Sequence, residues 1–364
     1  MRMTSAGCRA IARRLSTGLL SLMVTGCETG KTSGPVSPGS AAQVLAVSSN
    51  PRPIPAPQAV DFVAAVDSAI STGARGIVQT WTWSTLEPDS ARLDVQQLID
   101  DVRYARTRGL TVLLGIHPIN TVKREVPSDL ASVAWDDPRM LRRFDRLLDA
   151  LAPILGQVTY LSVGNEVAGF LGRAAQWPAY TTFLAQVVIS AHRRAPSIKV
   201  GATLEYVGAA SQTAFTRALV AVGDLAIYTL YPLNLDGFNV SPPNVSSVVF
   251  DNMIVLAGGK PVVLQELGYS ASPLNGSSEA QQAAFFTDAI AQWRARSSRM
   301  PFASLFLLHD FTPQMCSDFG TYYGLSNQPS FISFLCTLGL RRTDGTAKPS
   351  WTAVRNATAW LRTP

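Results

Sequence analysis

The chain has 364 residues, of which 47% are hydrophobic and 15% charged, and its formal net charge is +6. This length and composition permit a sizeable core and exclude an intrinsically disordered chain. One large α/β domain or two smaller domains fit the length.

The N-terminal segment 1–26 combines positive charge with a short apolar run. Four arginines precede Leu19–Val24. A charged stretch, a short apolar stretch and small residues are typical of a secretory signal peptide rather than a membrane span. Removing this segment takes away four arginines and no acidic residue, so the net charge falls from +6 to +2. The small remaining charge argues against a nucleic-acid partner, which requires a basic patch in the mature chain.

The residues at the end of this segment, Val24-Thr25-Gly26-Cys27, resemble the lipobox of bacterial lipoproteins. The resemblance implies that Cys27 is lipidated and that the exported protein is anchored in the bacterial cell envelope. Residues 27–42 are rich in Gly, Ser, Thr and Pro, which predicts a flexible tether. The overlapping run 26–32 is similar to a phosphate-binding loop, but it has one residue too few between its glycines and no strand precedes it, so nucleotide binding is excluded.

Two further cysteines, Cys316 and Cys336, lie in the C-terminal part of the chain. An exported compartment permits a disulfide between them, and we predict that bond. Two buried free thiols are the alternative.

From Gln43 onward, short apolar runs alternate with longer amphipathic stretches, a pattern typical of repeated βα units around a parallel sheet. The apolar runs predict eight strands: 44–47, 76–80, 111–116, 159–163, 199–202, 226–231, 261–265 and 304–308. Helical spacing of apolar residues predicts helices around 95–105, 144–151, 180–188 and 284–293, and a last helix over 351–362.

Eight strands alternating with about eight helices predict an α/β fold, a single (β/α)8 TIM barrel over residues 43–364. A doubly wound open sheet is the competing architecture. The missing glycine-rich fingerprint after the first strand argues against the dinucleotide-binding form of that sheet.

Two glutamates end predicted strands, Glu166 after the fourth and Glu266 after the seventh. An unpaired buried carboxylate costs several kcal/mol, so packing alone does not explain an acid at the end of a Val- and Leu-rich strand. For either glutamate alone, the alternative is that it marks the point where a strand emerges into solvent. The active site of a barrel lies at the carboxyl ends of its strands. Glycoside hydrolysis needs two carboxyl groups facing one another, about 5–5.5 Å apart in a retaining enzyme.

At these positions the sequence resembles clan A of the glycoside hydrolases, which carry Asn-Glu after strand four and Glu after strand seven. Asn165-Glu166 and Glu266 match these motifs. The resemblance implies that Glu166 is the acid/base, that Glu266 is the nucleophile and that Asn165 binds the sugar 2-hydroxyl. Tyr231, at the end of strand six, is similar to the clan tyrosine that contacts the nucleophile.

Aromatic residues near the same strand ends, among them Trp81 and Trp83, offer faces on which sugar rings stack, and as a group they favour a carbohydrate ligand; for any single one of them, ordinary packing is the favoured alternative. The segment Trp83–Pro88 resembles the Trp-x-x-x-Glu-Pro segment of several clan families, and there we interpret Glu87 as structural. His117 ends strand three, where some clan members bind sugar through a histidine; a hydrogen bond to backbone is the equal alternative.

The sequence departs from the clan in two places. A tryptophan is common after strand eight, but here Leu308-His309-Asp310-Phe311 follows, and we expect His309 or Phe311 to take its place. Thr229 occupies a position where several clan families have histidine.

These residues predict an exported, retaining β-glycosidase that acts on an oligo- or polysaccharide. A carbohydrate-binding lipoprotein with lost or reduced catalysis, and a transglycosylase, are the alternatives. Three dispersed histidines without His-Glu-x-x-His predict no metal site, and we expect no cofactor. The expected partners are a carbohydrate and, through the lipid on Cys27, a membrane; we expect a monomer.

Overall fold

The computed structural model describes residues 43–172, 175–234 and 236–362. The signal peptide 1–26, the lipidated Cys27 and the tether 27–42 are predictions that lie outside the described residues. Within those residues, no helix is both long and apolar enough to span a membrane.

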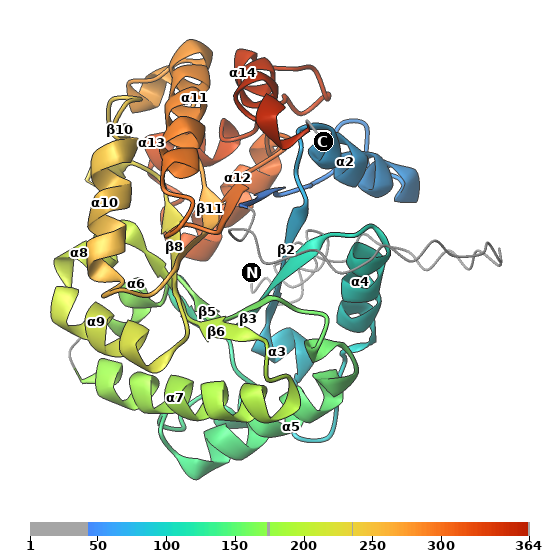
Figure 1. The fold of residues 1–364 in the computed structure, drawn as a ribbon, viewed down its shortest axis with the longest axis vertical. Coiled ribbons are helices and arrows are strands. Elements are labelled where there is room, and N and C mark those ends of the chain that lie inside the picture. The colour runs from blue at the N-terminus through green and yellow to red at the C-terminus, as the bar shows by residue number, and fades with distance from the viewer. Residues whose placement is uncertain (1–42, 173–174, 235, 363–364) are drawn as a thin grey trace.

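Strands and helices alternate along the chain and form a ring of helices around a central sheet (Figure 1). The central strands are β1 (Val44–Val47), β2 (Gly76–Thr82), β3 (Thr111–Asn120), β5 (Tyr160–Asn165), β6 (Lys199–Gly201), β7 (Thr203–Glu205), β8 (Ala226–Leu230), β11 (Val262–Leu267) and β12 (Phe302–Leu305). The surrounding helices are α2 (Ala59–Ser71), α4 (Gln96–Thr107), α5 (Pro138–Leu155), α7 (Gln176–Arg194), α9 (Thr213–Val222), α10 (Ser246–Leu256), α11 (Glu279–Ala295) and α14 (Pro349–Ala357).

Shorter elements lie in the connections between these strands and helices. They are α3 (Trp83–Leu86), β4 (Lys123–Arg124), η1 (Ser128–Leu130), α6 (Val167–Leu171), α8 (Tyr206–Ser211), β9 (Leu233–Asn234), β10 (Asn239–Val240), η2 (Pro273–Asn275), α12 (Pro313–Tyr323), α13 (Pro329–Cys336) and η3 (Ala359–Leu361).

The sheet is a barrel because its two ends belong to one strand. The order is β6-β5-β3-β2-β1-β12-β11-β8-β7, and the neighbours along this path are parallel. Only Ala202 separates β6 from β7, so the fifth strand pairs with the fourth through its first half and with the sixth through its second half. The predicted single (β/α)8 barrel is confirmed, and each of the eight predicted strands overlaps an observed one; the last begins and ends earlier than predicted, at Phe302–Leu305 rather than 304–308.

Inward-facing side chains fill the barrel. One buried cluster consists of Ala46, Leu113, Leu225, Ile227, Val263 and Phe302, with Val44, Val78 and Tyr160 against it. A larger cluster lies mostly between sheet and helices and includes Phe144, Leu147, Leu148 and Leu151, which share one face of α5 as their spacing predicts. The interior is therefore a packed core, and ligands are left with the barrel ends.

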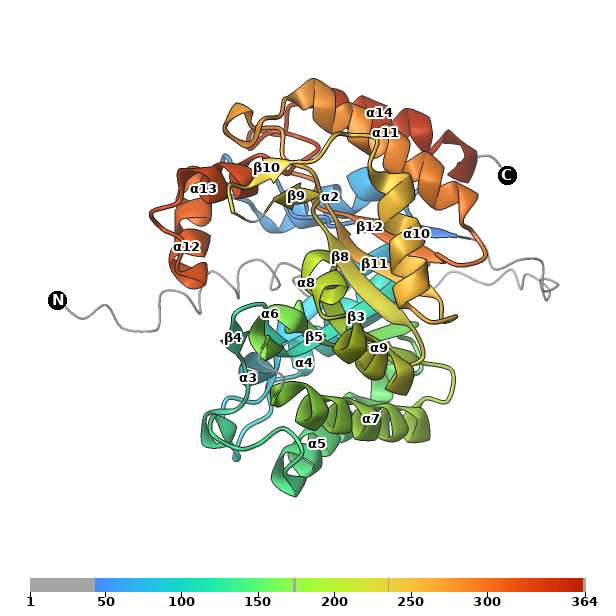
Figure 2. The same ribbon diagram turned by 90° about the vertical axis from the view of Figure 1, so that its left-hand side faces the viewer.

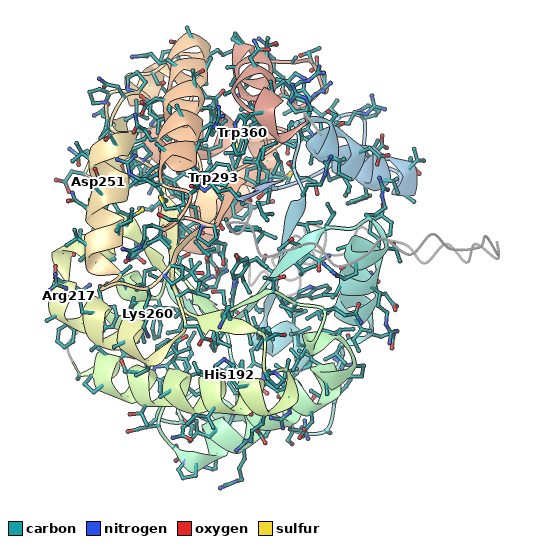
Figure 3. All side chains as sticks on the ribbon, viewed as in Figure 1. His192, Arg217, Asp251, Lys260, Trp293 and Trp360 are labelled. Carbon is teal, nitrogen blue, oxygen red and sulfur yellow. A yellow bond between two sulfur atoms is a disulfide. The ribbon has the colours of Figure 1, made fainter. Side chains whose placement is uncertain are left out.

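The helical ring closes where the C-terminal segment meets α2 and α11. The Thr358 hydroxyl donates to the Thr72 carbonyl oxygen (2.6 Å), and the rings of Trp293 and Trp360 have centroids 6.2 Å apart (Figure 3). The last helix differs from the prediction of 351–362: it begins at Pro349 and ends at Ala357, and a 3₁₀ turn follows. Proline favours this earlier start because it fits the first helical turn, where its missing N–H costs nothing.

Helices α12 and α13 form a lobe between β12 and α14, on the side of the barrel where the strands end (Figure 2). A disulfide joins Cys316 of α12 to Cys336 of α13. Buried apolar side chains hold the lobe together and attach it to the barrel: Leu307, Phe311, Cys316, Phe331, Phe334 and Leu338. The lobe is thus a fixed part of the barrel mouth.

Glu87 is a buried structural acid. Its side chain is fully buried and accepts hydrogen bonds from Trp83 Nε1 (2.8 Å), Arg143 Nε (2.6 Å) and Arg146 Nη2 (2.6 Å). It therefore ties α3 to α5, in keeping with its interpretation from the sequence.

Replacing Glu87 by alanine is expected to lower the free energy of unfolding by about 3–5 kcal/mol, because two arginines and an indole lose their shared acceptor. Denaturant unfolding measures this change. As control, Asp149→Ala removes a carboxylate that is 66% exposed and pairs with Arg194, and it should change stability by less than about 0.5 kcal/mol. Equal effects of the two variants would contradict the structural role of Glu87.

Candidate active site

Glu166 stands directly after β5 in an unusual backbone conformation. Its φ is 49° and its ψ is 46°, in the left-handed region that residues with a Cβ rarely adopt. Thr121, after β3, also has a positive φ of 52°, and its N–H donates to the Asn165 carbonyl oxygen (2.9 Å). Such strain, worth about 1–2 kcal/mol per residue, is typical of functional sites.

Two threonine hydroxyls hold the Glu166 carboxylate. Thr121 donates to Oε2 and Thr229 donates to Oε1, each at 2.7 Å. Thr229 lies in β8 and is buried. At the position where several clan families have histidine, this chain thus has a neutral hydrogen-bond donor to the first glutamate.

Glu266 lies in an irregular part of β11. The pairing of β11 with β8 shifts register between Leu264 and Glu266, which indicates a β-bulge. A bulge changes the direction in which the following side chains point. The hydroxyl of Tyr231 donates to Glu266 Oε2 at 2.5 Å, while the adjacent Gln265 turns toward Asn165.

A chain of buried polar side chains lies beneath the two glutamates. Thr203 Oγ1 donates to Gln265 Oε1 (2.8 Å), Gln265 Nε2 donates to Asn165 Oδ1 (2.8 Å), and Asn165 Nδ2 donates to Asn120 Oδ1 (3.1 Å). This chain fixes the orientation of the Asn165 amide, because its oxygen accepts and its nitrogen donates.

Burial and the neighbouring charge of Glu166 raise the pKa of Glu266 to about 8, and the hydrogen bond from Tyr231 opposes this rise. Burial, then the charge of Glu266, raises the pKa of Tyr231 well above its usual value, so its phenol keeps its proton and donates. The negative charge of Glu166 thus disfavours ionisation of Glu266, and the hydrogen bond from Tyr231 favours it.

The lobe adds two tyrosines that the sequence analysis missed. Tyr322 accepts a hydrogen bond from Asn120 Nδ2 (3.1 Å). Burial, then the charge of Glu166, raises the pKa of Tyr323, which also lines the cavity beside Glu266. Both belong to α12, within a long insertion after β12, and no strand-end pattern marks that segment.

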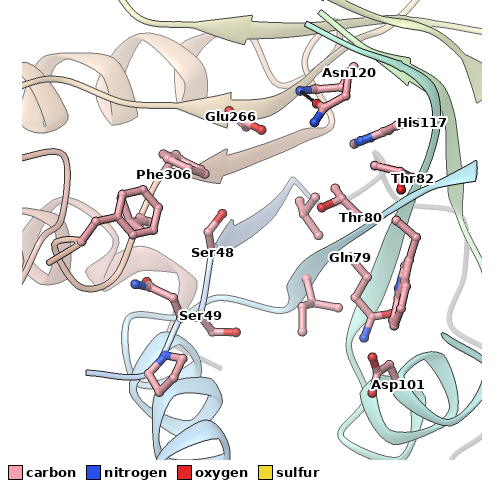
Figure 4. A pocket seen from close by; sticks show the side chains of 18 of the residues that line it. Ser48, Ser49, Gln79, Thr80, Thr82, Asp101, His117, Asn120, Glu266 and Phe306 are labelled. Carbon is pink, nitrogen blue, oxygen red and sulfur yellow. Dashed lines mark hydrogen bonds between the residues drawn. The ribbon is translucent and has the colours of Figure 1, made fainter. Parts of the chain in front are cut away.

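A cavity of about 340 Å³ opens beside Glu266. Figure 4 shows Glu266, His117 and Asn120 at one end of it. Asn165, Trp81 and Phe311 also line it, so the structure brings these predicted residues together.

His117 faces this cavity as a neutral imidazole. It is 5% exposed, its Nε2 has no hydrogen-bond partner among the described residues, and burial lowers its pKa to about 3. A buried polar atom without a partner at a cavity wall is available to a ligand hydroxyl.

Two predicted sugar-contacting residues, Trp83 and His309, lie elsewhere, and a third, Tyr231, contacts Glu266. Trp83 is fully buried among Phe144 and Phe183, and its indole N–H is bound to Glu87, so the prediction that it stacks on sugar is wrong. His309 does not line the cavity either. The Tyr231 hydroxyl binds Glu266, while its ring packs against Phe306 and Phe334.

His309 has a structural task. Its Nδ1 donates to the carbonyl oxygen of Asn50 (2.8 Å), and its backbone N–H donates to Asn50 Oδ1 (3.0 Å). These bonds hold the segment that follows β1. Phe311, the other residue expected in place of the clan tryptophan, does line the cavity.

No protein-family model matches the chain, and no curated protein matches it in sequence. Solved structures do match in fold. A variant of the GH5_18 protein from Streptomyces cattleya, in complex with Manβ1-4GlcNAc, has 19% identity and a TM-score of 0.64 over 84% of this chain and 77% of that chain. The chain shares the (β/α)8 barrel fold of this protein.

Two other glycoside hydrolases share this fold. An exo-β-1,4-mannosidase from Opitutaceae bacterium strain TAV5 has 14% identity and a TM-score of 0.66, over 87% of this chain and 59% of that chain. A family 39 glycoside hydrolase from Bacteroides cellulosilyticus WH2 has 16% identity and a TM-score of 0.57, over 81% of this chain and 60% of that chain.

Tyr231→Phe is expected to weaken the site through Glu266. Without the phenol hydrogen bond, the pKa of Glu266 rises further, so less of the carboxylate is ionised and it is less stabilised when charged. A hydrogen bond to a charged group contributes about 1.5–3 kcal/mol, so kcat/KM should fall about 10- to 100-fold.

The pH dependence of kcat/KM tests the same change. In the parent protein, kcat/KM should rise as pH increases through about 8, because the Glu266 carboxyl group, whose pKa is raised to that value, then becomes ionised. The Tyr231→Phe variant should move this rise to higher pH. Tyr228→Phe is the matched control, because the buried Tyr228 hydroxyl has no partner among the described residues. A Tyr231→Phe profile that coincides with the parent's would contradict the role of Tyr231.

Proposed function

We propose that this protein is a retaining glycoside hydrolase that cleaves a β-linked oligo- or polysaccharide by double displacement. The observation that carries the proposal is the placement of the two carboxylates by one strand end. Thr229 of β8 binds Glu166, and Tyr231, two residues later, binds Glu266. Tyr231 directly follows β8, and residues two apart in a chain lie at most about 7 Å from each other, so both carboxylates are held over one small region of the barrel mouth.

In this mechanism the two glutamates have different tasks. Glu266 attacks the anomeric carbon and forms a covalent glycosyl-enzyme, while Glu166 protonates the oxygen of the departing sugar. Glu166 then accepts a proton from water, which releases the glycosyl group with its configuration retained. The required state holds a proton on Glu166 and the charge on Glu266. The hydrogen bond from Tyr231 favours the charge on Glu266, whereas burial and the charge of Glu166 oppose it and raise the pKa of Glu266.

The fixed amide of Asn165 beside Glu266 supports a sugar-binding role, since its Nδ2 has room for a second hydrogen bond in addition to the one to Asn120. His117 Nε2 adds an unpartnered polar atom. The solved structures of similar fold include proteins in complex with carbohydrate, which supports the same ligand class.

Glu166→Ala and Glu266→Ala test the proposal with different expected behaviour. Both should lower hydrolysis of an active glycoside by at least about 10³-fold, because each removes an obligatory group. Azide should restore activity to Glu266→Ala with inverted configuration at the anomeric carbon. With Glu166→Ala and an activated aryl glycoside, azide should give a product of retained configuration. Anomeric configuration is read by proton NMR.

The alternatives predict other results in the same assays. A binding protein without catalysis would bind glycans with no difference in turnover between the parent and either variant. A transglycosylase would transfer the glycosyl group to added sugar rather than water, which product analysis at high acceptor concentration detects. Hydrolysis at the parent rate in both variants would eliminate the proposed catalytic pair.

We further propose that the protein is exported and anchored through a lipid on Cys27. The arginine-rich start, the short apolar run and the lipobox-like residues before Cys27 support this. In a bacterial host, Cys27→Ser should move the protein out of the membrane fraction and remove a lipid-sized mass from its N-terminus. Cys8→Ser, within the proposed signal peptide, is the control. Unchanged fractionation of both variants would contradict the anchor.

A further inference from the structure

The barrel wall has an opening between β1 and β2. These strands pair at one position, Ala46 with Gly76, whereas β2 pairs with β3 over its whole length. Beyond Ala46, β1 stays with β12, since the Ser48 N–H donates to the Leu305 carbonyl oxygen (2.9 Å). The upper half of β2 therefore has no strand partner on its β1 side among the described residues.

The cavity beside Glu266 extends into this opening. Its walls include Thr80 on β2, and also Gln79 and Trp81, the residues on either side of Thr80. Adjacent residues of a strand point to opposite faces of the sheet, so the cavity reaches both faces of β2 and passes through the wall. Its volume of about 340 Å³ is at the lower end of the range for small-ligand sites, roughly 300–1,000 Å³.

The outer end of the cavity is polar. Asp101 of α4 is 3% exposed and accepts a hydrogen bond from Gln97 Nε2 (2.8 Å). Gln79 lies near it (Figure 4), and the buried Gln79 Oε1 has no hydrogen-bond partner among the described residues. Burial raises the pKa of Asp101 to about 7. Polar groups buried this far from water need hydrogen-bond partners; Gln97 supplies one to Asp101, and the neighbouring wall residues Phe62 and Val66 are apolar.

The cavity lies on one defined side of the cleaved bond, if the proposed function holds. The acid protonates the leaving sugar, so the leaving sugar lies beside Glu166. Glu266, Asn165 and His117 line the cavity, whereas Glu166 does not. The cavity is therefore on the side of the sugar that becomes bonded to Glu266, the glycone.

We propose that this cleft binds a second sugar residue on the glycone side, with Trp81 against its ring and its hydroxyl groups donating to Gln79 Oε1 and the Asp101 carboxyl group. This inference rests on the proposed function and adds a specificity to it: the preferred glycone is a disaccharide unit rather than a single sugar. The small volume and the closed outer end at α4 fit a short unit.

The test compares paired chromogenic probes that differ by one glycone sugar. The probes are the para-nitrophenyl β-glucoside and β-cellobioside, and the β-mannoside and β-mannobioside. The parent protein should show at least tenfold higher kcat/KM for the disaccharide probe of the pair that it cleaves. Gln79→Leu and Asp101→Asn should each lower that value about tenfold, the change that corresponds to one lost hydrogen bond, and leave the value for the monosaccharide probe unchanged.

Asp100→Asn is the matched control, because Asp100 is the neighbour of Asp101 in α4 and does not line the cavity. Thermal unfolding of each variant checks that it is folded; Gln79→Asn and Asp101→Glu provide the comparison if a first variant is unstable. A monosaccharide probe cleaved as well as its disaccharide partner, with Glu266→Ala inactive on both, would overturn the second-sugar site and leave the proposed function standing. No turnover of any probe by the parent protein would count against both.

Discussion

Two carboxylates held side by side in largely desolvated surroundings are the constraint on which the barrel mouth depends. Each negative charge there raises the free energy of the folded protein, and repulsion between the two charges raises it further. The described structure meets this cost with hydroxyl donors rather than cations: Thr121 and Thr229 bind Glu166, and Tyr231 binds Glu266. No described cation is bound to the pair, so these hydroxyl donors are the groups that stabilise its charge.

Unusual backbone conformations position these groups, and they lower the stability of the protein. Thr121 and Glu166 both have positive φ, and a bulge in β11 precedes Glu266. A regular strand would send Gln265 and Glu266 to opposite faces of the sheet. The bulge instead lets Gln265 reach Asn165 while Glu266 reaches Tyr231. The strain is tolerated since the strands beneath pair in regular register and are buried on both sides.

The sequence predicted the barrel well because its signals are local. Every strand is a short apolar run between amphipathic stretches, and a carboxylate after such a run is conspicuous against a buried background. The same reasoning failed at Trp83 and His309. Whether an aromatic or polar residue near a strand end points into the site or away from it depends on the local backbone conformation. The amino-acid composition of the segment does not predict that direction. The structural role of Glu87 was predicted correctly, because a buried carboxylate needs hydrogen-bond partners whatever its direction.

The features that remained hidden are those that depend on distant parts of the chain. Tyr322 and Tyr323 reach the site from α12, which the Cys316–Cys336 disulfide and an apolar cluster hold against the barrel. The opening between β1 and β2 likewise arises because β1 pairs with β12 over its whole length and with β2 at one position. The first of these pairings joins residues that lie far apart in the sequence. Neither feature supplies the hydroxyl groups that bind the two glutamates. These come from Thr229 in β8, from Thr121 directly after β3 and from Tyr231 directly after β8. The two glutamates and the walls of the cavity beside them are therefore built from separate parts of the sequence.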